Sequence, residues 1–148
     1  MRRRIAVLLA LILVTLPVLQ AQTFIEEEYK AFFTELAKET YVVMSELGEL
    51  SQRLGKAGSI FLLKAHLKEY EGYRDRLLAV LRELVVIEPP EKYKDFHREF
   101  TLGIMYYYIA VETVIEGIEK NSPVIVMLAS SFILKGVDHI NNATLLKP

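Results

Sequence analysis

The chain has no cysteine and no tryptophan among its 148 residues. Without cysteine it has no disulfides, no thiolate metal site, no haem attached through a CxxCH motif and no lipid-modified cysteine. The folded protein must therefore be stabilised by the packing of its side chains.

The motifs of common catalytic sites are also missing. The sequence has no Gly-x-Ser-x-Gly turn, no His-Glu-x-x-His pair and none of the Glu-x-x-His motifs that di-iron helical bundles carry. Its glycine-rich turn, Gly55 to Gly58, lacks the Lys-Ser/Thr ending of a phosphate-binding loop. We therefore expect a protein that is not an enzyme, and we assign no catalytic residue, no metal ligand and no cofactor.

The N-terminus has the pattern of a secretory signal peptide. Arg2, Arg3 and Arg4 precede an uncharged apolar stretch that ends at the small residue Ala21. We predict a signal peptide over residues 1–21 and a secreted or extracytoplasmic protein. The alternative is an uncleaved membrane anchor, because residues 5–25 carry no charge and about 20 residues are enough to cross a bilayer.

The rest of the chain is mildly acidic. Without the three N-terminal arginines, the 18 Lys and Arg of the chain fall to 15, against 19 Asp and Glu, which gives a net charge of −4. A nucleic-acid partner requires a basic surface, so we expect none. We expect membrane contact only through an uncleaved signal segment.

Four helical patterns follow residue 22, separated by turn residues. Thr23-Phe24-Ile25-Glu26 matches a capping box, which predicts the start of the first helix. The Gly55–Gly58 turn, the pair Pro89-Pro90 and the pair Asn121-Ser122 then separate runs of apolar residues spaced three and four apart. Such short connections predict an all-α, antiparallel up-down-up-down four-helix bundle that forms a single domain over residues 22–148.

The fourth helix, which begins at about Pro123, opens with a 12-residue run without charge, Pro123 to Leu134. This run is too short to cross a bilayer. It predicts that the fourth helix is the most buried of the four.

Small residues recur every seven positions in the last three helices, and this spacing keeps them on one face of each helix. A glycine inside a helix costs about 0.8–1 kcal/mol relative to alanine, so we expect a compensating interaction. One interpretation is close approach of the third and fourth helices. The other is a self-association face or a ligand cavity, and the set on the second helix is expected to face solvent or a partner. The three sets are Ala65, Gly72, Ala79; Gly103, Ala110, Gly117; and Ala129, Gly136, Ala143.

Three consecutive tyrosines, Tyr106, Tyr107 and Tyr108, lie on the third helix. Successive helical residues are 100° apart, so the three rings cannot all enter one core. We expect Tyr107 to point inward and the other two rings to cover the seams with neighbouring helices. The functional alternative is a binding site for a flat ligand or a partner protein, because tyrosine is enriched at interface hot spots.

His97, Tyr93 and Arg74 also occupy apolar stripes and complete the set of candidate binding residues. For His97 we expect a core histidine that is hydrogen-bonded to a tyrosine or to a backbone carbonyl. For Arg74 we expect either a paired carboxylate or a side chain that reaches the surface. A two-histidine haem site is not favoured, since antiparallel helices would leave His97 and His139 about six residues, roughly 9 Å, out of level.

The segment from Leu84 to His97, LVVIEPPEKYKDFH, resembles a pattern in small exported helical proteins: a helix end, a Pro-Pro break and a helix that carries a histidine. The resemblance implies an exported helical bundle and transfers no catalytic residue. We expect a non-enzymatic protein that binds a protein partner, a second copy of itself as a homo-oligomer, or a small apolar ligand. The alternative is a haem or metal carrier with the same fold.

Overall fold

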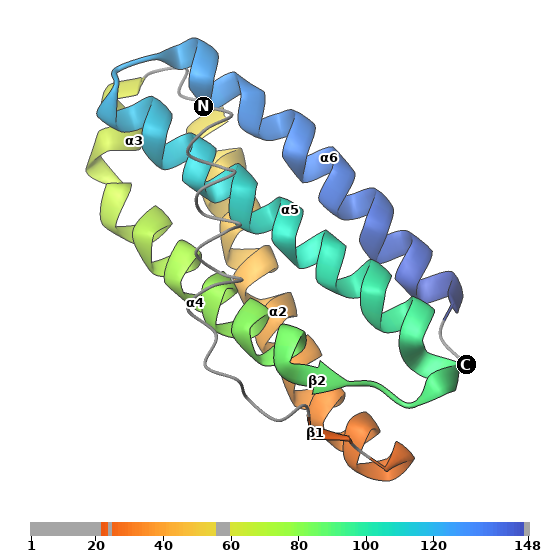
Figure 1. Cartoon of the computed structure of the whole chain (residues 1–148). Coiled ribbons are helices and arrows are strands. Elements are labelled where there is room, and N and C mark those ends of the chain that lie inside the picture. Colours follow the sequence, from red (N-terminus) through yellow and green to blue (C-terminus); the bar gives the residue numbers. More distant parts are fainter. Residues whose placement is uncertain (1–21, 24, 56–59, 147–148) are drawn as a thin grey trace.

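The computed structural model describes residues 22–23, 25–55 and 60–146, and the predicted signal peptide lies outside them. Within these residues the protein is all-α, as predicted. The helices are α2 (Glu26–Gly55), α3 (Ile60–Ala65), α4 (Leu67–Val86), α5 (Lys94–Glu119) and α6 (Pro123–Leu146). The four long helices run in alternating directions along the chain (Figure 1).

The start of the first helix differs in detail from the capping-box prediction. Thr23 does not cap α2, because it lies in the two-residue strand β1 (Gln22–Thr23), which pairs in parallel with β2 (Ile87–Glu88). The backbone nitrogen of Ile25 is instead 3.4 Å from Oε2 of Glu28. Glu28 is the third residue of the helix, and in a capping box a glutamate at that position bonds the backbone N–H of the residue that precedes the helix. The cap therefore lies two residues later than the sequence indicated.

The core lies where α2, α4 and α5 face one another. Tyr93, just before α5, and the residues that follow it along α5 at steps of three and four are all buried: His97, Phe100, Ile104, Tyr107, Val111, Val114 and Ile118. The α2 side of the core is joined to α5 through aromatic rings, because Phe33 packs against both Phe96 and Phe100 with ring centroids 4.6 Å apart. The three- and four-residue spacing thus identified the inner face of α5 correctly.

The prediction that the fourth helix is the most buried one is wrong. In the described part of the chain α6 makes its extensive contacts with α5 alone, so it lies on the outer side of the core (Figure 1). Its fully buried residues are small, namely Ala129, Gly136 and Ala143. An extensive contact between α2 and α6, which would close a ring of four helices, is not found among the described residues.

The predicted close approach of the third and fourth helices is confirmed. A Cβ atom added to Gly136 would lie 2.9 Å from the ring of Tyr107, and one added to Gly117 would lie 2.8 Å from the backbone nitrogen of Val126. Gly72 on α4, by contrast, is exposed, and an added Cβ would meet no atom within 4 Å. The small residues of α5 and α6 are therefore needed for helix contact, whereas those of α4 face solvent.

Candidate functional site

His97 is buried and makes two hydrogen bonds that tie three helices together. Its Nε2 donates to the carbonyl oxygen of Leu84 in the last turns of α4, over 3.0 Å. A carbonyl can only accept, so Nδ1 is the acceptor and takes the hydroxyl hydrogen of Tyr29 on α2, over 3.1 Å. Burial lowers the pKa of His97 below its usual value, which favours the neutral ring. The prediction of a core histidine bonded to a tyrosine or a carbonyl is confirmed, with both partners present.

Tyr93 lies beside this pair and is also buried. Its ring centroid is 5.0 Å from that of Tyr29, and Lys92 Nζ lies 5.3 Å above its ring. Tyr93 and His97 thus offer little surface to a partner molecule.

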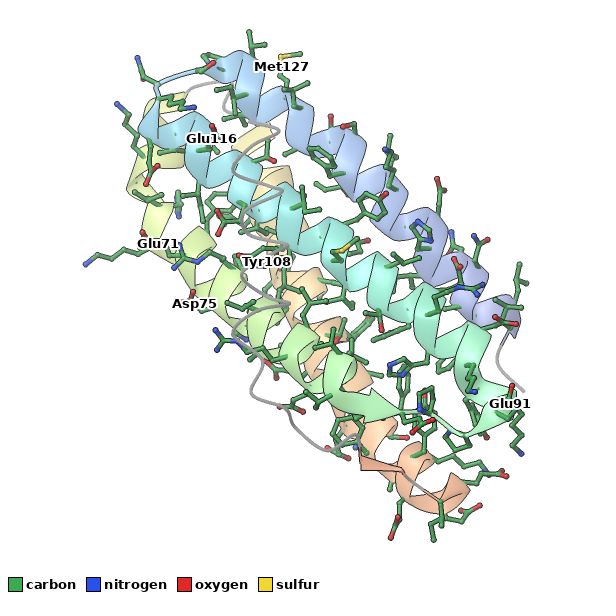
Figure 2. All side chains as sticks on the ribbon, viewed as in Figure 1. Glu71, Asp75, Glu91, Tyr108, Glu116 and Met127 are labelled. Carbon is green, nitrogen blue, oxygen red and sulfur yellow. The ribbon has the colours of Figure 1, made fainter. Side chains whose placement is uncertain are left out.

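Tyr108 and Arg74 form a polar seam between α5 and α4. The hydroxyl of Tyr108 donates to Glu112 over 3.3 Å, and Glu112 lies 3.8 Å from Nε of Arg74 (Figure 2 shows Tyr108 on the side of α5 that faces α4). Burial raises the pKa of Tyr108 to about 12. Arg74 is half-buried and also pairs with Asp75 over 2.8 Å, so both expectations for this arginine hold: it has carboxylate partners and its head reaches the surface.

Tyr106 and Tyr107 lie on the side of α5 that faces α6. Tyr107 is buried against Gly136, where a larger residue would collide with its ring. Tyr106 is half-buried and stacks on the imidazole of His139, with ring centroids 5.3 Å apart and planes 8° apart, under Lys135 Nζ at 5.5 Å. The three tyrosines therefore fan out as expected, and two of them, Tyr107 and Tyr108, are almost fully covered by the protein itself.

A short electrostatic contact extends this stack. His139 Nδ1 is 2.8 Å from Glu99 Oε2, and the histidine lowers the pKa of that carboxyl group below its ordinary value. The contact ties the last turns of α6 to the first turns of α5. His97 and His139 therefore have different partners in different parts of the fold, and no group of three or more metal-ligating side chains is found within the described ranges.

The described candidates do not converge on one cavity. An open groove in the described structure lies elsewhere, between α2 and α4, with Phe32, Leu36 and Val80 among its lining residues. Arg76 spans it, since its guanidinium reaches Glu39 over 2.8 Å and Glu46 over 2.6 Å. These ion pairs connect α4 to α2 across the groove.

The feature that the sequence interpretation missed is the outer side of α6. Val124 is 69% exposed, Met127 72% and Leu134 65%, and Leu128 and Ser131 are exposed beside them. We call these five residues the outer patch. Met127 lies near the start of α6 on the side away from α5 (Figure 2).

A helical projection of the sequence contained the signal for this patch. Met127 and Leu134 each precede a buried small residue, Ala129 and Gly136, by two positions, and two positions correspond to 200° around a helix. The exposed apolar residues of the first half of α6 therefore lie opposite its contact stripe. Among the described residues α6 is also the one helix long and apolar enough to cross a membrane, and 11% of its most apolar 18-residue window is buried.

Comparison with known proteins gives no match, whether to protein-family models, to curated protein sequences or to solved structures.

Proposed function

We propose that this chain is an exported, non-enzymatic helical-bundle protein that works by binding, and that the outer patch of α6 is its binding surface. The observation that carries the proposal is the exposure of Val124, Met127, Leu128 and Leu134 on the outer side of α6, while the small residues of its inner side, Ala129, Gly136 and Ala143, are buried. Contiguous apolar surface without a covering element marks interaction sites in soluble proteins. The apolar N-terminal segment, residues 1–21, supports export.

The candidate tyrosines have a secondary role in this proposal. Tyr107 and Tyr108 are buried, and Tyr106 is half-buried at the edge of the α5–α6 seam. The rings of Tyr106 and Tyr107 hold α6 in place, the first against His139 and the second against Gly136, whereas Tyr108 faces α4. A buried ring contributes to binding by fixing the position of the binding helix, and it needs no direct contact with the partner.

A charge-insertion variant tests the binding surface. We expect the double variant Met127→Glu/Leu134→Glu to keep its free energy of unfolding within about 0.5 kcal/mol, because both side chains are exposed. Wild-type protein should bind the apolar dye anilinonaphthalene sulfonate or associate as its concentration rises, and the double variant should lose both properties. Dye fluorescence measures the first property, and the mass from light scattering measures the second.

The matched control is Tyr41→Glu on α2, where the tyrosine is 74% exposed. This variant adds a charge at an equally exposed ring outside α6 and should behave as wild type. If Tyr41→Glu and Met127→Glu/Leu134→Glu reduce dye binding and association equally, the outer patch is not the binding surface.

A further inference from the structure

We propose that the outer patch of α6 is occupied by a lipid bilayer, with α6 lying in the interface between headgroups and acyl chains. This inference rests on the proposed function and names the chemistry of the partner. An amphipathic helix that lies in a membrane interface buries its apolar side by about 5–10 Å at the boundary of the acyl chains. The exposed side chains of Val124, Met127 and Leu134 have the apolar character that this position requires.

A second copy of the chain fits the patch poorly because the patch is short. It occupies the first 12 residues of the 24-residue helix α6, a strip about 18 Å long and one helix, about 10 Å, wide. Each partner in a stable complex buries about 800 Å². A contact between two such strips falls well short of that area.

Extending the contact along the whole of α6 brings in polar residues. In an antiparallel pair centred on the middle of the helix, Met127 of one copy would meet Asn142 of the other, and Asp138 would meet Ser131. A parallel pair would place Asp138 against Asp138. Burial of a carboxylate without a partner is costly, so neither pairing accounts for the apolar half of α6.

A bilayer accepts this uneven pattern. The first half of α6 is apolar on its outer side, whereas the exposed residues of the second half are mixed. Asp138, Asn141 and Asn142 lie there beside Val137 and Leu145, and the three polar side chains remain among the hydrated headgroups if the helix enters with its N-terminal half deeper. The apolar run Ile5–Ala21 directly precedes Gln22 in the sequence. Gln22 pairs with Ile87 at the end of the helix assembly at which α6 also ends. If that run is kept as an anchor, it holds this end of α6 within reach of the same bilayer.

Interfacial binding also preserves the contact between α6 and α5. A transmembrane position would expose the stripe Gly103, Ala110 and Gly117 of α5, and would place Lys135 and Asp138 in hydrocarbon, which costs about 2.5–3.5 kcal/mol for each charge. Lying in the interface leaves both the stripe and the two charges where the structure has them.

The charge balance of α6 indicates the type of lipid surface. Lys135 and Asp138 are the basic and acidic residues of the helix, and their charges cancel. Attraction to the bilayer therefore depends on apolar burial, and a net-neutral phosphatidylcholine surface should suffice. We expect binding that changes little with salt or with added phosphatidylglycerol.

The absence of native cysteine provides the experiment, because a single introduced cysteine can carry an environment-sensitive nitrobenzoxadiazole label on the full chain. We expect labels at Met127→Cys and Leu134→Cys to shift to shorter emission wavelength when phosphatidylcholine vesicles are added, and a label at Tyr41→Cys on α2 to stay unshifted. A Leu134→Ser substitution, with the label at Met127→Cys, should lower the partition constant by about tenfold.

Four outcomes would overturn the inference. If all three labels shift alike or the α6 labels stay in water while the chain is bound through residues 1–21, the bilayer does not occupy the patch. If the label at Met127→Cys shifts without vesicles as the protein mass doubles, a second copy occupies it, and the proposed function stands while the lipid inference fails. If the α6 labels stay in water under all conditions and the mass never rises, the proposed function fails as well.

Discussion

Replacing Gly117 by alanine is expected to destabilise the protein by about 1–3 kcal/mol, the usual cost of overpacking, even though alanine is the better helix former. The added Cβ would lie 2.8 Å from the backbone nitrogen of Val126 and 3.2 Å from the carbonyl oxygen of Ser122. Backbone atoms cannot rotate away as a side-chain end can, so α6 would have to move from α5. Urea denaturation measures the free energy of unfolding.

The same substitution at Gly72 or Gly48 is the matched control. Both glycines are exposed inside helices, and an added Cβ meets nothing within 4 Å at either position. Each alanine should therefore stabilise the protein by about 0.8–1 kcal/mol. A stabilising effect of Gly117→Ala similar to that of Gly72→Ala would contradict the close packing of α5 and α6.

The second large effect is expected at His97. The substitution His97→Ala removes a buried ring and leaves the carbonyl of Leu84 and the hydroxyl of Tyr29 without their shared partner, at a cost of about 2–4 kcal/mol. His139→Ala is the matched control, because His139 is partly exposed and its pair with Glu99 is at the surface seam. That control should cost less than about 1 kcal/mol.

The pH dependence of stability distinguishes the buried histidine from a merely large side chain. Burial lowers the pKa of His97 in the folded state, so the unfolded chain takes up a proton first as the pH falls. Stability is therefore full above about pH 6.5, the unfolded value, and decreases below it by up to about 1.4 kcal/mol per pH unit. The carboxyl groups of Glu26 and Glu99 have lowered pKa values, so their protonation affects stability only at lower pH. A His97→Gln variant should lose most of the decrease between pH 6.5 and pH 5; an unchanged slope would contradict the neutral, desolvated ring.

The sequence predicted the inner half of this fold well, for a physical reason. In α5, large apolar residues repeat at steps of three and four. In an α-helix this spacing places them in one stripe, which faces the core. The environment of His97 followed from the same stripe, because a histidine among buried apolar residues needs hydrogen-bond partners. Which residues would supply them, Tyr29 and Leu84, depends on how α2 and α4 are placed, and periodicity within one helix does not determine that placement.

The location of α6 was not predictable from its apolar composition. An uncharged run can belong to a helix that is buried on all sides or to a helix that is buried on one side only, against a single neighbour. The two cases differ only in which positions of the run carry small residues. Ala129, Gly136 and Ala143 allow α6 to approach α5 closely, yet they bury little area, so the large residues on the opposite side remain exposed. The seven-residue repeat of small residues predicted the contact correctly, whereas the hydropathy of Pro123–Leu134 was interpreted as burial.

The proposed function and the lipid inference both require that a bound partner other than this chain covers the outer patch of α6 when the protein is functioning. The most direct measurement is the reactivity of single cysteines toward N-ethylmaleimide in intact cells, at Met127→Cys on the patch and at Tyr41→Cys on α2, quantified by mass spectrometry. In purified protein kept dilute and free of lipid, both exposed positions should react at similar rates. The account predicts that in cells the cysteine at position 127 is protected several-fold while that at position 41 still reacts; equal reaction at both positions in cells would contradict it.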